Sequence, residues 1–420
     1  MLRNAFRRSG RLEKALAAGI ALLLIGNGAF AQRAGGDGEE QRSSGPTIDP
    51  TTGTKLNEAI ELLNQENYAA ARAKIGELRM DRLSPYERSR VEQILFSIAY
   101  QEENYDDARS HLEQAIAAGG LNEQEISQAR YQIAQIFMAE ERWAEGAQAL
   151  ENWFQSAANP NSAAYYLLAV AYYQLEQYDK ALPAAEKAVE LAENPQESWL
   201  QLVLALYIQD ERFRDALPLL ERLVAMAPDR KTYWVQLSSI YGQLEDYPKA
   251  LATMQLAYNA GLLTEDSEYR RLADLLMFNE VPYRGGQILE KAIAEGKVNG
   301  DAQAYEKLAN CWIAAREFDK AIAPLERAAS MSQNGDLYVR LGEVHIQREN
   351  WDAAVDALQR GLDKGGLRDT SNAELLMGIS LYSQERYRDA RPWFERAARS
   401  EARRQTARGY LQLIEAKLSS

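Results

Sequence analysis

Small and large apolar residues recur along most of this 420-residue chain with a period near thirty-five residues. An aromatic residue followed three positions later by alanine or glycine recurs in ten pairs that lie 33 to 38 residues apart. The pairs are Tyr68/Ala71, Tyr105/Ala108, Trp143/Gly146, Tyr178/Ala181, Phe213/Ala216, Tyr247/Ala250, Tyr283/Gly286, Phe318/Ala321, Trp351/Ala354 and Tyr387/Ala390. A fixed period of this length indicates a repeat architecture with one structural unit per period.

Most periods add a core residue four positions after the small residue, as at Leu325, and a large residue nine positions before it, as at Trp312. This spacing predicts two antiparallel helices, because the small residue lets them approach and the aromatic residue fills the space at their turn. One hairpin cannot bury its apolar face alone, so successive hairpins should stack. We therefore predict an all-α solenoid of about ten helical hairpins over residues 54–404, and a C-terminal capping helix over residues 405–420.

The seventh period departs most from this pattern. Gly285 and Gly286 stand together at the close contact, Met277 takes the large position, and Glu290 falls where a core residue is expected. We expect that hairpin to be loosely packed or shifted.

The first thirty-one residues have the pattern of a cleavable signal peptide. A basic arm with Arg7, Arg8 and Arg11 precedes an apolar stretch over residues 15–25, and small residues lead to Ala31. The apolar stretch is too short to span a bilayer. We predict cleavage after Ala31 and a periplasmic mature protein without a membrane span, with an uncleaved anchor as the alternative. Residues 32–53 are nearly devoid of apolar side chains and are predicted to be a flexible linker.

The composition disfavours nucleic-acid binding, metal binding and catalysis. The formal charge of −13 disfavours nucleic-acid binding, which needs a basic surface. One cysteine, Cys311, excludes an internal disulfide framework, and two histidines, His111 and His345, leave few ligands or bases. The sequence contains no glycine-rich phosphate loop, no HExxH and no Gly-x-Ser-x-Gly elbow. We therefore expect no catalytic residue, no cofactor and no metal site.

The ten pairs and their spacing resemble the tetratricopeptide repeat over roughly residues 52–404. This resemblance implies that the solenoid is right-handed and that the protein binds other proteins. Five stretches go beyond what the repeat requires: residues 83–87, 151–154, 168–175, 197–202 and 233–244. In this order, behind a signal peptide, they resemble the periplasmic tetratricopeptide proteins encoded beside TonB–ExbB–ExbD energy-transduction systems.

That second resemblance implies a non-enzymatic adaptor that assists TonB-dependent uptake at the outer membrane, for example of iron–siderophore complexes, with TonB, ExbB or ExbD as partners. The alternative is a scaffold in outer-membrane protein assembly or polysaccharide export. A hydrolase or transferase would need an added catalytic domain, and residues 32–53 are too few to form one.

The first helices of such repeats line a concave groove, and counting back from each small residue assigns side chains to it. The predicted groove residues of the third to sixth units are Tyr131, Gln135, Met138, Tyr166, Tyr173, Gln174, Gln201, Gln209, Gln236, Ser239 and Gln243. Tyrosine offers flat apolar area with a hydroxyl group, and glutamine both donates and accepts, so this set suits an extended peptide. A merely solvated groove is the alternative. The Lys/Asn set that clamps a terminal carboxylate in chaperone-binding relatives is missing, since Arg271 and Asn310 occupy groove positions singly.

The C-terminal region is basic within an acidic chain. Its arginines are Arg396, Arg399, Arg403, Arg404 and Arg408. They either form a solvated helix face or meet an acidic protein or lipid headgroups.

Overall fold

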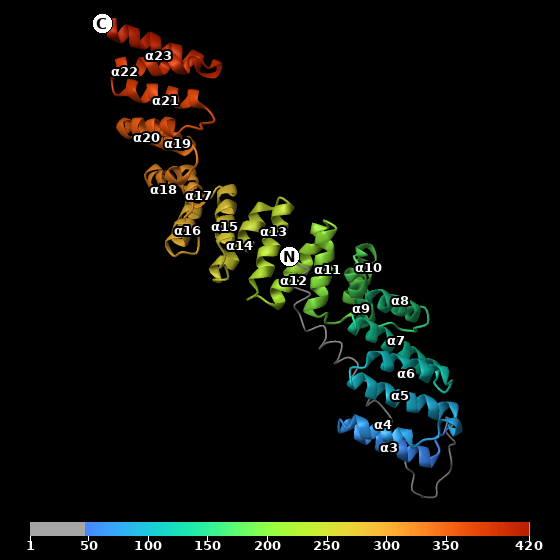
Figure 1. Cartoon of the computed structure of the whole chain (residues 1–420). Helices are drawn as coiled ribbons and strands as arrows, with labels where there is room; N and C mark the ends of the chain where they lie inside the picture. Colours follow the sequence, from blue (N-terminus) through green and yellow to red (C-terminus); the bar gives the residue numbers. More distant parts are fainter. Residues whose placement is uncertain (1–46, 420) are drawn as a thin grey trace. The chain divides into compact units, whose positions relative to one another are not determined.

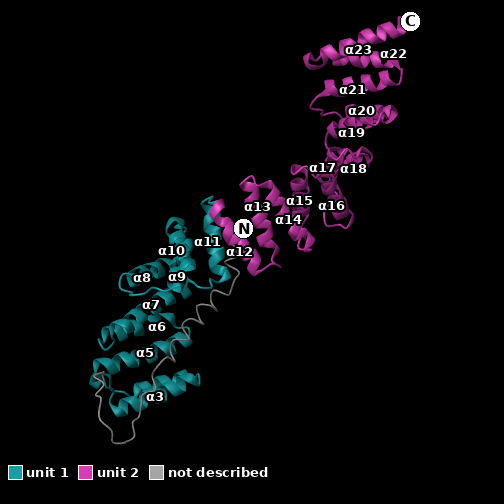
Figure 2. Ribbon diagram, turned by 180° about the vertical axis from the view of Figure 1, so that it is seen from behind, with its two compact units in different colours: residues 1–212 teal, residues 213–420 magenta. Residues whose placement is uncertain are grey.

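The computed structural model describes residues 47–419, which form 21 α-helices, one short 3-10 helix and, within that range, no strand (Figure 1). The predicted signal peptide, its cleavage position and most of the predicted linker lie outside the described residues. The chain divides into two compact units, Met1–Arg212 and Phe213–Ser420 (Figure 2).

The helices of the first unit are α3 (Pro50–Asn64), α4 (Tyr68–Gly76), α5 (Pro85–Gln101), α6 (Tyr105–Ala117), α7 (Glu123–Ala139), α8 (Trp143–Phe154), α9 (Ser162–Gln174), α10 (Tyr178–Leu191) and α11 (Glu197–Gln209), with the 3-10 helix at Met80–Arg82. The helices of the second unit are α12 (Phe213–Met226), α13 (Lys231–Gln243), α14 (Tyr247–Asn259), α15 (Asp266–Phe278), α16 (Pro282–Ala294), α17 (Ala302–Ala314), α18 (Phe318–Met331), α19 (Asp336–Gln347), α20 (Trp351–Lys364), α21 (Thr370–Ser383), α22 (Tyr387–Ala397) and α23 (Glu401–Ser419).

Consecutive helices pair into hairpins in both units, and each hairpin packs against the next. The first unit holds the pairs α3/α4, α5/α6, α7/α8 and α9/α10 and ends with α11. The second unit begins with α12, holds the pairs from α13/α14 to α21/α22, and ends with α23 packed on α22. The prediction of an all-α solenoid of helical hairpins closed by a C-terminal helix is confirmed.

The turn after each first helix has one fixed geometry. Ten residues there, nine of them glutamates, have a left-handed backbone with φ between 54° and 60°. The next amide donates to a carbonyl five residues back, as from Asn67 N to Leu62 O at 2.9 Å. This bond satisfies a carbonyl that the helix end leaves open, which offsets the steric strain of a left-handed side-chain-bearing residue. Nine of the ten predicted aromatic residues then occupy the first position of the second helix.

The tenth aromatic residue, Tyr283, reveals a shifted register in the seventh hairpin. The left-handed residue is Glu280, and Val281 N donates to Leu276 O at 2.8 Å. Leu276 therefore takes the place that the pattern assigned to Met277, and Pro282 begins α16.

The same shift changes which side chains of that hairpin are buried in the core. Leu289 is fully buried, whereas Glu290 is exposed to solvent. Gly285 thus stands at the small position that we assigned to Gly286. Of the two outcomes expected for this hairpin, loose packing or a shift, the structure shows a shift, and the shift leaves Glu290 outside the core.

Two element boundaries also differ from prediction. Helix α3 begins at Pro50 inside the predicted linker, because Asp49 caps it by accepting bonds from Thr51 N at 2.9 Å and Thr52 N at 3.2 Å. The side chain of Thr52 is buried. At the other end, α23 starts at Glu401 rather than at residue 405.

Tyrosine–glutamate hydrogen bonds join neighbouring hairpins, with the hydroxyl group of a first helix donating to a carboxylate of the preceding second helix. The pairs are Tyr172 to Glu151, Tyr207 to Glu186 at 2.7 Å, and Tyr241 to Glu221 at 2.8 Å. Burial and then the Glu221 bond raise the pKa of Tyr241 to about 12, and burial raises that of Tyr131 to about 12.

These shifts predict a loss of stability at alkaline pH. Unfolded tyrosine ionises near a pKa of about 10, so the unfolded chain releases its protons first as the pH rises. The contribution of Tyr241 is complete below about pH 10 and is lost as the pH approaches 12. We expect the urea midpoint to fall across that window, and to fall less steeply in Tyr241→Phe. Superimposable pH profiles of Tyr241→Phe and the parent chain would contradict this assignment.

Candidate peptide-binding face

The first helices of neighbouring hairpins pack against one another, as α7 does against α9 in the first unit and α15 against α17 in the second. We call the side chains that stand seven, eight, eleven and fifteen positions before each small residue the first-helix face. The predicted groove residues, Gln236 apart, lie at these positions. Those of α7, α9 and α11 belong to the first unit, and those of α13 belong to the second.

The three residues predicted on α7 are buried, which corrects their assignment to an open surface. Met138 is 1% exposed, and it lies against Gly146, whose missing side chain leaves room for the sulfur atom. Tyr131 is 8% exposed, with its ring centroid 4.7 Å from that of Trp153. Gln135 is equally buried. A tryptophan and a glycine on α8 thus draw this part of the face into the core.

On α9 and α11 the predicted residues stay accessible. Tyr166 is half-buried and stacks on Trp199, with centroids 5.0 Å apart and planes 18° apart. Tyr173 is half-buried beside Tyr178, and Gln174 is exposed at the end of α9.

Helix α11 continues this set. Gln201 is half-buried and donates to Glu197 Oε1 at 3.1 Å, and Gln209 is exposed. The first unit therefore presents two half-buried tyrosines and three glutamines.

In the second unit, Gln236 and Ser239 are half-buried on α13, and Gln243 is exposed. Ser239 Oγ accepts a hydrogen bond from the Arg271 guanidinium of α15. The sequence analysis noted Arg271 only as an isolated basic residue, because the contact with Ser239 joins residues 32 positions apart.

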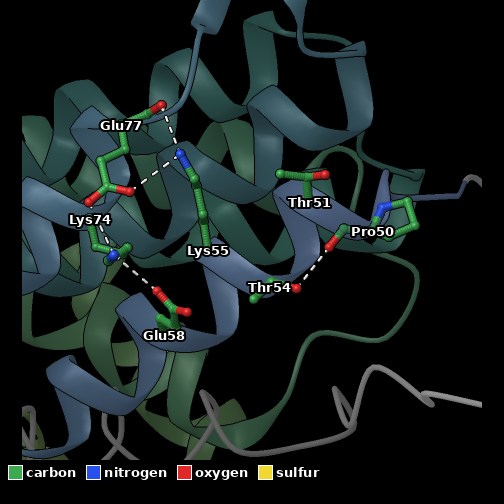
Figure 3. Close-up of a pocket in the computed structure, with 7 residues that line it drawn as sticks. All are labelled: Pro50, Thr51, Thr54, Lys55, Glu58, Lys74 and Glu77. Atoms are coloured by element: carbon green, nitrogen blue, oxygen red, sulfur yellow. Dashed lines mark hydrogen bonds and ion pairs between the residues drawn. The ribbon is translucent and has the colours of Figure 1, made fainter.

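A separate surface hollow of about 470 Å³ lies between α3 and α4 (Figure 3). Its cations are already paired: Lys55 Nζ lies 3.3 Å from Glu77, and Lys74 Nζ lies 3.0 Å from both Glu58 and Glu77. The hydrogen bond to Glu58 raises the pKa of Lys74, and the bond from Lys74 lowers that of Glu77. The hollow offers a polar surface whose charges satisfy one another.

The residues weighed for chemistry are held in structural contacts. His111 Nδ1 lies 2.7 Å from Glu92 Oε2, a partner 19 residues away that the local sequence did not indicate. Burial lowers the pKa of His345 and raises that of Cys311 to about 11, so that thiol is a poor nucleophile. Within residues 47–419, no group of three or more His, Cys, Asp or Glu side chains is arranged to hold a metal ion.

The C-terminal arginines are partly engaged. Arg403 pairs with Asp369 at 2.8 Å, and the Arg396 guanidinium lies 4.5 Å from the ring centroid of Trp393. Arg399, Arg404 and Arg408 are exposed. Among the described helices, none has the length and apolar character needed to cross a bilayer.

Two sequence profiles of one repeat family match this chain. One tetratricopeptide repeat profile matches residues 162–195, and a second matches residues 95–160, 205–262 and 339–405, together more than half of the chain. A comparison with curated proteins finds no match.

Solved structures with the same repeat are similar at low identity. The C-terminal part of a repeat protein from Cytophaga hutchinsonii is 14% identical over 58% of this chain and 98% of that chain, with a TM-score of 0.42. A repeat protein from Parabacteroides merdae is 17% identical over 61% and 98%, with a TM-score of 0.34. MamA from Desulfovibrio magneticus is 14% identical over 41% and 97%, with a TM-score of 0.33. Likeness at this level carries no argument about partners.

Proteins built from this repeat bind proteins or peptides, and the repeats typically form non-catalytic scaffolds. The profile matches and the recurring helical hairpins agree over most of the described residues. This chain belongs to the tetratricopeptide repeat family.

Proposed function

We propose that this chain is a non-enzymatic periplasmic adaptor that binds an extended protein segment on the first-helix face of α9 and α11. Its proposed role is to assist TonB-dependent energy transduction and uptake, for example of iron–siderophore complexes. The observation that carries the binding role is the accessible set Tyr166, Tyr173, Gln174, Gln201 and Gln209.

The chemistry of this set suits a peptide backbone. Tyr166 is held flat against Trp199, so it offers a preorganised ring at little entropic cost on binding. The exposed amides of Gln174 and Gln209 can donate to carbonyls and accept from amides of an extended chain. Aromatic side chains beside adaptable polar groups are typical of protein-recognition surfaces.

The cellular part of the proposal rests on the sequence. The basic and apolar pattern of residues 1–31 supports export, and the five stretches that resemble TonB-associated repeat proteins support the transport role. Assembly or export of outer-membrane components is the competing role.

We predict that Tyr166→Ala together with Tyr173→Ala lowers partner capture about 30-fold or more, since aromatic anchors at interfaces often contribute about 1–2 kcal/mol each. The measurement is affinity capture of the processed full chain from periplasm after gentle cross-linking, read by mass spectrometry. Tyr165→Ala is the matched control, because Tyr165 lies on the same helix but packs against Phe154, with centroids 4.7 Å apart.

Recovery of TonB, ExbB or ExbD by the parent chain and by Tyr165→Ala, with loss in the double variant, would support the proposal. Equal recovery by the double variant would refute binding through this face. Recovery of outer-membrane assembly or polysaccharide export components would instead refute the transport role.

A further inference from the structure

The second unit contains a half-buried guanidinium without a counter-ion. Arg271 is partly buried on α15, and its one hydrogen-bond partner among residues 47–419 is the uncharged hydroxyl group of Ser239. In the described part of the chain, no carboxylate oxygen lies within 4 Å of its nitrogen atoms. Burial accordingly lowers the pKa of Arg271, whereas the nearby Arg270 has a raised one because Asp266 and Asp301 accept from it.

The carboxylates of α15, and Asp301 at the start of α17, are paired with other cations. Asp266 and Asp301 hold Arg270, Asp274 pairs with Lys307, and Glu268 lies 3.0 Å from Lys231. Among residues 47–419, the charge of Arg271 therefore has no carboxylate partner and is available to an anionic ligand. A partly desolvated guanidinium is a strong site for a carboxylate, which it can bind with two parallel hydrogen bonds.

The backbone leaves this guanidinium accessible. A side-chain carbon added to Gly242 would lie 3.8 Å from Arg271 Nη2, its nearest neighbour. Because Gly242 has no side chain, α13 does not cover the guanidinium at that point.

An apolar anchor lies on the same side of α15. Phe278, the last residue of the helix, is 62% exposed, and its ring centroid lies 4.0 Å from that of Tyr247. Seven residues correspond to almost two turns, so Arg271 and Phe278 share a side of α15 about 10 Å apart.

We infer that Arg271 and Phe278 form a two-point site for an extended peptide that carries an acidic residue and a large apolar residue three positions apart. A polyproline II segment brings residues i and i+3 to the same side at a separation of about 9 Å, which matches the spacing on α15. The carboxylate would bind Arg271 and the apolar side chain would pack on Phe278. This inference deepens the proposed function, on which it rests for the idea of a peptide ligand, but it uses residues of the other unit.

The test is fluorescence anisotropy with the full chain and labelled peptides with an Asp-Pro-Pro-Leu core or the reversed Leu-Pro-Pro-Asp core. Peptides with asparagine for aspartate, or alanine for leucine, complete the set. The protein variants are Arg271→Gln, Arg271→Lys and Phe278→Ala. Controls are Arg222→Gln and Leu256→Ala, which alter an exposed cation of α12 and an exposed apolar residue of α14.

We expect Arg271→Gln to raise the Kd of the better aspartate peptide about tenfold, and to leave that of its asparagine counterpart unchanged. The Kd of Arg271→Lys should lie between those of the parent chain and Arg271→Gln, because lysine keeps the positive charge but cannot form two parallel hydrogen bonds. Phe278→Ala should raise the Kd of the leucine peptide and leave the Kd of the alanine peptide unchanged. Circular dichroism and urea unfolding confirm that the variants fold.

Lack of binding by both aspartate peptides, or equal Kd values for the parent chain and Arg271→Gln, would overturn the inference. Failure of the periplasmic capture would not, because the peptides test the second unit directly. Conversely, loss of peptide binding leaves the α9 and α11 face and its transport role intact.

Discussion

Replacing Gly335 with alanine is expected to destabilise the second unit by about 3 kcal/mol or more, one of the two largest effects that we predict for a single substitution. Gly335 caps α19 where the chain crosses α20. A side-chain carbon on Gly335 would lie 2.0 Å from the carbonyl oxygen of Gly361 and 2.8 Å from its carbonyl carbon. Both atoms belong to backbone, so no rotamer change can relieve the overlap.

Glycine is needed at position 335 because a side chain would not fit there, and not because of the backbone dihedral angles. Gly335 has a φ of −84°, which any residue adopts, and its amide donates to Gly365 O at 2.9 Å. To admit alanine, α19 and α20 would have to separate, which would weaken that bond and the burial of Tyr338 and Val339 between the helices.

Gly409→Ala is the matched control in the same unit. Nothing lies within 4 Å of a side-chain carbon at Gly409, which is inside α23. Alanine there should stabilise the helix by about 0.5–1 kcal/mol. Urea unfolding followed by circular dichroism measures both variants, and hydrogen exchange in α19 and α20 locates the loss, because repeat proteins can open locally. Equal midpoints for Gly335→Ala and the parent chain would contradict the predicted overlap.

The fold was predictable because its determinants are local and periodic. An aromatic residue begins nine of the ten second helices, and a small residue follows it one turn later. Each hairpin therefore repeats the same packing problem. The pattern failed in the seventh hairpin because its features disagreed: Tyr283 indicated Gly286 as the small residue, whereas Leu289 indicated Gly285. Glu290 favoured the register of Gly285, and the left-handed turn at Glu280 shows that this is the register adopted.

The candidate site was less predictable, because burial depends on neighbours that are distant in sequence. Position in the repeat assigned Met138 and Tyr166 to the same surface. Met138 is instead drawn inward by the space beside Gly146, whereas Tyr166 rests on Trp199 and stays accessible. The glycine at position 146, where most units have alanine, was a signal in the sequence that could have indicated the first of these outcomes.

Replacing Trp312 with alanine is the second large prediction, with an expected loss of about 3–5 kcal/mol. Trp312 is 1% exposed on α17, and three of its ring atoms lie 2.9 Å from the position of a side-chain carbon on Gly286 of α16. The ring of Tyr283 also packs against it, with centroids 5.4 Å apart. Removing the indole would leave a large cavity at the contact between two hairpins. Trp312→Phe should lose less, because the buried indole Nε1 has no hydrogen-bond partner in the described part of the chain, and phenylalanine removes that unsatisfied group.

The contact with Gly286 turns this prediction into a test of the seventh hairpin. Gly286→Leu alone should destabilise the unit, because leucine would overlap the indole ring. In the Trp312→Ala background the same leucine can occupy the vacated space, so the double variant should be more stable than the sum of the two losses predicts, by about 2 kcal/mol. Urea unfolding of the four proteins completes the cycle, and additive losses would mean that the two positions do not share this space. Strong coupling would show that Gly286, the second of the two adjacent glycines that weaken the sequence pattern at this hairpin, leaves the space that Trp312 of the next hairpin occupies.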